Sequence, residues 1–347
     1  MAGSDVQQSL RDSWQHSIAD ENVSRMNITR SVSEIGGILP RVDLPTSAPD
    51  NAVLGGIPVK GVRAESGRTP WWLWWNVLSV DAPTVAVVWA ALFARVSGGR
   101  LSAAEATVLI LAVWVIYVSD RLLDGWTAKD RAALHERHRF CERHRLVLAG
   151  LVAFASGALV WLTTEHLPAA EVAAGVKLGV ILVLYMAGIH AGRGRIAWVF
   201  PKEIAVGLLF ACGVTLPLWS RSIRFPWGAC LPWILFGFLC ALNCLSIECC
   251  ENHDRSGKWR QPPHPLVRWA DSRLSRMAAA LAIAVLAACL VGNPKSSSIA
   301  ALLAVWLGAL LLVLLNYGRT KLSPAALRVL ADAALLVPAL LALAIGG

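Results

Sequence analysis

Two acidic residues at the end of an apolar run raise the first chemical question. Residues 117–126 read YVSDRLLDGW and overlap the end of the apolar stretch 108–118, VLILAVWVIYV. Asp120 and Asp124 are four residues apart, so a helix places both carboxylates on one face. Because carboxylates are among the most costly groups to hold near hydrocarbon, we expect this pair to have a partner.

A second acidic cluster follows another apolar run. Residues 243–258 read NCLSIECCENHDRSGK. Glu248, Glu251 and Asp254 follow one another there at three-residue steps, so they share a helix face. Asn243 is eight residues before Glu251 and lies near the same face, two turns deeper along the helix.

The two clusters together favour chemistry on a diphosphate. Clustered carboxylates repel one another unless a cation lies between them, and Mg²⁺ is typically held by one or two carboxylates plus the phosphate oxygens of a substrate. The metal and nearby Lys or Arg side chains would stabilise pyrophosphate as it leaves. The competing interpretation is that these residues are solvated helix ends in the headgroup layer.

The composition predicts that membrane spans position these clusters. Of the 347 residues, 56% are hydrophobic and 16% are charged, whereas about a quarter of the residues of a soluble protein are charged. The net charge of +9 comes from short basic segments between apolar blocks, which favours a membrane surface over nucleic acid. We therefore expect an all-α, polytopic membrane protein that contacts lipids and no nucleic acid.

Nine apolar segments are near the ~20 residues that a membrane-spanning helix needs. Turn-forming sequences such as SGGR, RFPWG and GNPKSS separate them. The predicted transmembrane helices are 76–96, 102–123, 146–165, 170–190, 202–220, 227–250, 272–292, 297–316 and 325–345.

The distribution of basic residues predicts the orientation. Residues 1–66 are polar and lack a sustained period, which indicates a largely disordered tail before a membrane domain of residues 67–347. With the tail inside, the inner loops hold eighteen Lys and Arg residues and the outer loops hold five. The N-terminus is therefore expected in the cytoplasm and the C-terminus outside, in a cytoplasmic membrane of bacterial type.

The first acidic motif resembles that of the UbiA superfamily of intramembrane prenyltransferases. Members have nine transmembrane helices around a central cavity, with Asp-rich motifs after helices 2 and 6. The last two Asp of the family motif NDxxDxxxD match Asp120 and Asp124, while Ile116 and Tyr117 replace its Asn and first Asp. The resemblance covers about residues 68–345.

Two further segments extend this resemblance. ECCENHDRSGK is similar to the second family motif, with Glu251 and Asp254 as the best matches. FPKEIAVGLLFACG, residues 200–213, is similar to the start of the family's helix 5, where a Lys or Arg reaches the diphosphate. Lys202 takes that role by position.

The resemblance implies an enzyme that ionises an isoprenyl diphosphate within the membrane and transfers the prenyl group to an aromatic or lipid acceptor. Lys202 would assist at the diphosphate. The implied Mg²⁺ ligands are Asp120, Asp124, Glu251 and Asp254, with Glu248 beside them, and the implied substrate contacts are Asn76, Tyr117, Asn243, Arg137 and Arg139.

Two other functions stay open. A terpene cyclase of the same superfamily would ionise the same diphosphate and use no acceptor. A transporter or lipid-binding protein without enzymatic activity would use the acidic clusters for ions. HERHRFCERHR, residues 135–145, stands where the family has its Arg-Thr and Arg-Pro elements, so the substrate specificities of known members are not carried over.

Three ionisable residues inside predicted spans have structural interpretations. Arg328 and Asp332 are four residues apart and are predicted to pair along one helix face. Asp81, close to the start of the first span, is predicted to cap a helix.

Overall fold

The computed structural model describes residues 74–127, 143–191, 201–221, 227–253, 259, 262–291 and 296–345. They all belong to the second of the two units into which the chain divides, Arg68–Gly347. The regular elements in these ranges are helices, and a single isolated bridge pairs His253 with Trp259. The predicted all-α class is therefore confirmed for these ranges, while the predicted tail lies outside the described residues.

Eight helices within the described ranges are long and apolar enough to cross a membrane. Their ends lie close to those predicted from hydropathy and turn-forming sequences. They are α4 (Ala103–Thr127), α6 (Arg145–His166), α7 (Ala169–Ala191), α9 (Lys202–Arg221), α10 (Trp227–Glu251), α12 (Leu274–Val291), α13 (Ser296–Gly318) and α14 (Pro324–Ile345).

The first predicted span, residues 76–96, is not one continuous helix. A four-residue helix, α2 (Trp74–Val77), precedes α3 (Asp81–Val96), which has 16 residues. Ser79 lies between them with φ 60°, in the left-handed region that residues other than Gly rarely adopt. The prediction of an unbroken span was wrong, because the chain turns at Ser79.

Side chains of α4 hold this turn in place. The indole Nε1 of Trp114 donates to the carbonyl oxygen of Leu78 over 3.1 Å. The guanidinium of Arg121 donates to the carbonyl oxygen of Asn76 over 3.0 Å and to Ser79 Oγ. These bonds satisfy backbone carbonyls that the break removes from a regular helix, as a membrane interior requires.

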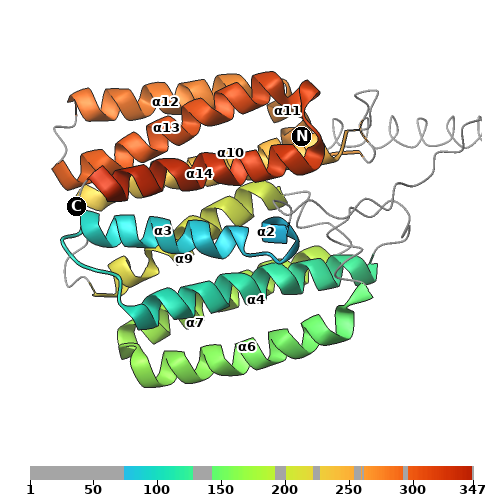
Figure 1. The fold of residues 1–347 in the computed structure, drawn as a ribbon, viewed down its shortest axis with the longest axis vertical. Helices are drawn as coiled ribbons and strands as arrows, with labels where there is room; N and C mark the ends of the chain where they lie inside the picture. Colours follow the sequence, from blue (N-terminus) through green and yellow to red (C-terminus); the bar gives the residue numbers. More distant parts are fainter. Residues whose placement is uncertain are drawn as a thin grey trace, which may run out of the picture. The chain divides into compact units, whose positions relative to one another are not determined.

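Helix α10 is central and packs against α9, α12, α13 and α14 (Figure 1). Its Phe236 stacks on Trp89 of α3 with ring centroids 4.1 Å apart. Trp89 is fully buried, and its indole Nε1 donates to the carbonyl oxygen of Leu335 in α14 over 3.0 Å. One aromatic side chain therefore joins three helices of the core.

A small residue lets α9 and α10 approach each other. A Cβ atom on Gly207 would lie 2.5 Å from the backbone nitrogen of Ala241, so only a glycine fits this contact. Close backbone approach at small residues is how helices commonly associate in membranes, where burial of apolar side chains gives little driving force.

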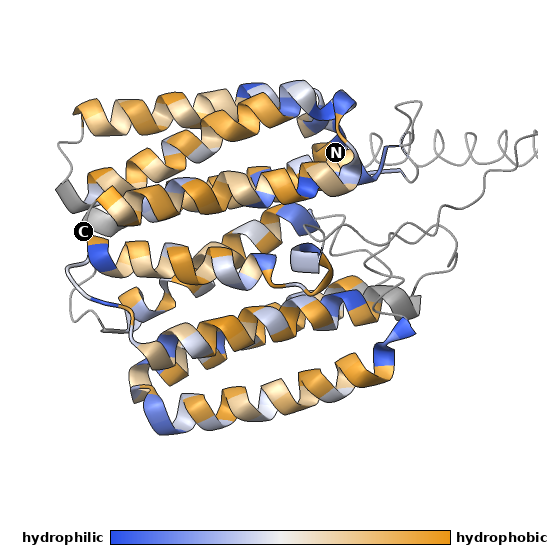
Figure 2. Ribbon diagram, viewed as in Figure 1, coloured by the Kyte–Doolittle hydropathy of each residue, from blue (hydrophilic) through white to orange (hydrophobic). Residues whose placement is uncertain are grey.

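Helices α6 and α7 form the edge of the bundle. Helix α6 packs mainly on α4, and α7 packs mainly on α9. No residue in the most apolar stretch of α7 is buried in the protein, so its apolar side chains face outward. Hydrophobic residues predominate along the long helices (Figure 2). Lipid is the environment that such surfaces require, and the protein is an integral membrane protein.

Candidate functional site

The described residues of the predicted motifs lie at one end of the bundle. The end of α4, the start of α9 and the end of α10 lie on the same side (Figure 1). Lys202, the first residue of α9, places its Nζ 3.2 Å from each carboxylate oxygen of Asp120, 82 residues away in sequence. The first acidic motif and the lysine selected from the sequence are therefore in direct contact.

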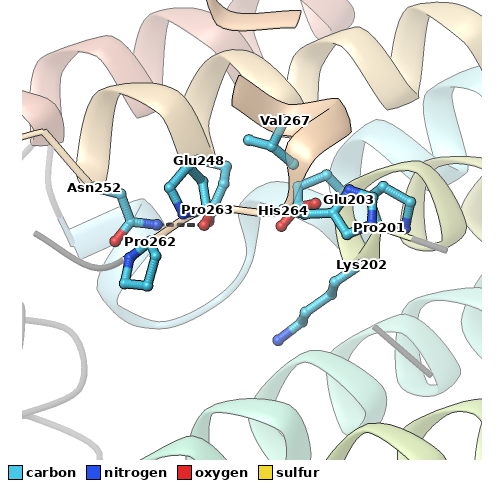
Figure 3. Close-up of a pocket in the computed structure, with 9 residues that line it drawn as sticks. All are labelled: Pro201, Lys202, Glu203, Glu248, Asn252, Pro262, Pro263, His264 and Val267. Atoms are coloured by element: carbon cyan, nitrogen blue, oxygen red, sulfur yellow. Dashed lines mark hydrogen bonds between the residues drawn. The ribbon is translucent and has the colours of Figure 1, made fainter. Parts of the chain in front are cut away.

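A pocket of about 180 Å³ adjoins this ion pair (Figure 3). Within it the Glu248 carboxylate accepts a hydrogen bond from Asn252, and the Lys202 side chain extends away from Pro201 and Glu203. Sites that enclose a whole organic ligand are usually ~300 Å³ or larger, so this pocket suits a compact polar group. Its lining residues are Pro201, Lys202, Glu203, Glu248, Asn252, Pro262, Pro263, His264 and Val267.

Charges of both signs surround the pocket. The N-terminus of α9 contributes the positive end of a helix dipole beside the Lys202 ammonium. Glu203 and Glu248 contribute carboxyl groups, and both interact electrostatically with Lys202. The pocket can therefore offer cationic groups to an anion and oxygen ligands to a metal ion.

Glu251 pairs with Arg328, a contact that the sequence analysis did not predict. Its two carboxylate oxygens accept hydrogen bonds of 2.9 and 3.0 Å from the Arg328 guanidinium at the start of α14. The predicted pair of Arg328 with Asp332 is therefore wrong, because a largely buried two-bond arrangement is stronger than a pair along one helix face. Both carboxylate oxygens of Glu251 therefore bond to Arg328, and its role as a metal ligand stays a prediction.

Asp332 lies one turn further into α14 than Arg328 and belongs to an interior polar cluster. The Asn76 amide Nδ2 donates to Asp81 Oδ2 over 2.5 Å and to Asp332 Oδ2 over 3.5 Å. The predicted capping role of Asp81 is wrong, because the N-cap of α3 is Val80 and it makes no side-chain capping bond. Asp81 instead accepts a hydrogen bond from the side chain of Asn76.

The residues predicted to contact substrate in the interior come together in this cluster. Tyr117 interacts electrostatically with Asp81 and Asp332, and Asn243 lies within hydrogen-bonding reach of Asp332. The Arg121 guanidinium lies over the Tyr117 ring, 5.5 Å from its centroid. Sequence reasoning missed the roles of Asp81 and Arg121, although charged residues inside apolar spans are a usable signal for a functional site.

Several predicted site residues cannot be placed in this geometry. Among the described residues, no three His, Cys, Asp or Glu side chains gather in a metal-binding arrangement. Outside the described residues lie Arg137, Arg139, Asp254 and the side chain of Asp124.

Comparison of the chain with protein-family models, with curated proteins and with solved structures finds no match. The resemblance to the UbiA superfamily therefore rests on the motif residues themselves. Their arrangement in the bundle is an independent observation.

Proposed function

We propose that this membrane protein is a prenyltransferase that ionises an isoprenyl diphosphate and transfers the prenyl group to an aromatic or lipid acceptor. The observation that supports it is the Lys202–Asp120 contact beside a pocket that contains Glu248. The ammonium thereby contacts a carboxylate of the first acidic motif and interacts electrostatically with a carboxyl group of the second. Departing pyrophosphate needs a fixed cation and metal-binding oxygens in one place.

Each polar group has a role in the proposed reaction. The diphosphate occupies the pocket, where Lys202 exchanges its contact with Asp120 for phosphate oxygens. Asp120 and Glu248 would hold Mg²⁺, which needs only one or two carboxylates when the phosphate oxygens of a substrate complete its shell. When bound, the metal neutralises charge on the leaving pyrophosphate. The sequence also offers Asp124 and Asp254 to the metal, whereas Glu251 orients Arg328 at the same end.

The proposed reaction breaks one bond, forms another and releases one proton. The bond between the isoprenoid carbon and the diphosphate oxygen breaks, and pyrophosphate leaves with the electron pair. The resulting allylic cation is attacked by the acceptor, which then loses a proton. In this proposal the diphosphate occupies the pocket and the isoprenoid chain extends along apolar helix faces.

The proposal includes nine spans with the N-terminus in the cytoplasm. Helices α2 and α3 together would form the ninth span, since α3 alone is shorter than the ~20 residues that cross a bilayer. The excess of basic residues would place the pocket on the cytoplasmic side. Reporter fusions at the two chain ends should then report opposite sides of the membrane, and reports from one side would contradict this topology.

Pyrophosphate release tests the proposed function. The full chain in lipid nanodiscs is incubated with Mg²⁺ and a panel of isoprenyl diphosphates, with and without phenolic and lipid acceptors. Asp120→Asn should reduce pyrophosphate release about 100-fold, as loss of a leaving-group stabiliser does elsewhere. Lys202→Ala should mainly raise KM for the diphosphate, because it removes a point charge.

Lys321→Ala is the matched control, since Lys321 is an exposed lysine in the short helix η3 (Arg319–Lys321) that precedes α14. It should leave release unchanged. No pyrophosphate from any diphosphate with the wild-type protein would contradict the proposal. A cyclic hydrocarbon formed without an acceptor would identify the terpene cyclase instead.

A further inference from the structure

Two carboxyl groups lie close together inside the bundle, away from the pocket. Asp81 begins α3 and is 3% exposed, and Asp332 lies within α14. The same amide nitrogen of Asn76 donates to both carboxyl groups. Two acids that share one donor in a membrane interior cannot both carry full negative charge without a cation between them.

A guanidinium lies near the pair. Arg121 of α4 interacts electrostatically with Asp332 and donates hydrogen bonds to the carbonyl of Asn76 and the hydroxyl of Ser79. Among the described residues, Tyr117 of α4 and Cys244 of α10 also face the pair. Because the Asp332 carboxyl group lies within hydrogen-bonding reach of Asp81, a proton held by one of the two acids removes the repulsion between them.

Two buried polar atoms near the pair lack a hydrogen-bond partner among the described residues. Arg121 and Asn243 are 4% and 5% exposed, and Arg121 Nη2 and Asn243 Oδ1 find no hydrogen-bond partner among the described residues. Buried polar atoms are normally satisfied, so an unsatisfied donor and an unsatisfied acceptor on two residues that both interact with Asp332 point to a polar ligand. The ligand would have to accept from a guanidinium and donate to an amide or carboxylate oxygen, which a hydroxyl group does.

The cluster joins three helices. Tyr117, Cys244 and Asp332 come from α4, α10 and α14, interact electrostatically with one another and are half-buried in the protein. Cys244 interacts in addition with Lys202 and Glu248 of the pocket. Cys244 is therefore within electrostatic range of both the pocket and the interior cluster.

We propose that Asp81 and Asp332 share one proton and that this pair binds a hydroxyl-bearing acceptor and takes up its proton. The binding and transfer steps rest on the proposed prenyltransferase function, whereas the shared proton does not. The acceptor hydroxyl donates to the carboxylate and accepts from Arg121. When the nucleophile's electron pair forms the bond to the allylic carbon, the acceptor's proton passes to the carboxylate and leaves later to water.

Infrared spectroscopy of the full chain in nanodiscs at neutral pH tests the shared proton. The wild-type protein should show a protonated carboxyl band that shifts when its aspartates carry ¹³C, a measurement that needs no substitution. Asp81→Asn and Asp332→Asn should each remove this band, because the remaining acid is then ionised beside Arg121. The inference is overturned if labelled wild-type protein lacks the band, or if both single variants keep one.

The coupling of the two half-reactions tests the acceptor site. With Mg²⁺, an isoprenyl diphosphate and a phenol or lipid alcohol, Asp332→Asn should keep pyrophosphate release within about threefold of wild type. The prenylated product should fall about 100-fold, the usual contribution of a general base, and prenyl alcohol formed with water should replace it. Thr215→Val is the control, because Thr215 is buried and its hydroxyl donates within α9.

The two proposals fail in different ways. Absence of pyrophosphate release from the wild-type protein removes the proposed function and, with it, the acceptor role, while the infrared band still decides the shared proton. Wild-type amounts of prenylated product from Asp332→Asn would overturn the acceptor role alone. Equal loss of pyrophosphate and product in that variant would place Asp332 in the diphosphate step and would also overturn it.

Discussion

Helices α10 and α7 are almost equally apolar but have opposite positions in the protein. Their most apolar stretches have mean hydropathies of 2.0 and 2.1, yet 61% of the residues are buried in α10 and none in α7. Mean hydropathy therefore predicts that both helices enter the membrane and says nothing of which one is enclosed by protein. The difference in burial must come from groups that are stable against protein but unstable against lipid.

Polar side chains are one such feature. The buried polar residues of α10 include Asn243, Ser246 and Glu251, and they face partners on other helices. In α7, Glu171 is buried near one end, and Lys177 is exposed. Polar groups inside apolar spans are retained where protein can satisfy them, so their number marks the enclosed helix.

Removing an aromatic ring should affect the core most and the edge least. Trp89→Ala should destabilise the protein by about 3–5 kcal/mol, because it empties a fully buried site and removes the bond to α14. Trp161→Ala in α6 should change stability by less than about 0.5 kcal/mol, because Trp161 is 59% exposed. Unfolding of both variants in detergent measures the difference, and similar losses would show that the edge helices pack on something else.

The ion pair at the end of α10 should matter only while both partners are present. Arg328→Met should cost about 3 kcal/mol, because it leaves Glu251 buried without its guanidinium. Adding Glu251→Gln should restore much of the loss, since the uncompensated charge is then gone. A double variant as unstable as the single one would show that Arg328 stabilises through packing rather than charge.

Sequence patterns predicted the helix ends well because hydropathy and turn residues are local. The turn at Ser79 was missed because Trp114 and Arg121, on another helix, hold it. The partner of Arg328 was missed for the same reason, since a spacing of four suggested Asp332 and the fold supplied Glu251. Only the packed structure places both donors and acceptors.

In the candidate site too, one contact could be predicted from the sequence and another could not. The contact of Lys202 with Asp120 could be anticipated because both belong to motifs with a family resemblance. The pairing of Asp81 with Asp332 could not, because each stands alone in its own apolar segment and no motif links them. Their isolation in apolar sequence was itself a signal, although it carries no information about distance.

Two glycines give the smallest and most direct test of the comparison. Gly207 of α9 lies against the backbone of Ala241 in α10, whereas an added Cβ on Gly179 of α7 would meet no atom within 4 Å. Gly207→Ala should therefore push the helices apart and cost about 2 kcal/mol, because backbone atoms cannot move aside as a flexible side chain does.

Gly179→Ala should leave stability unchanged or raise it by about 0.5 kcal/mol, since alanine favours a helix over glycine. Both substitutions add one methyl group to a helix of similar hydropathy, so their difference isolates what lies opposite. Thermal unfolding of the two variants in the same detergent provides the measurement. If Gly179→Ala were the more damaging of the two, α7 would be enclosed by a partner, and the outward apolar face would be an interface rather than a lipid contact.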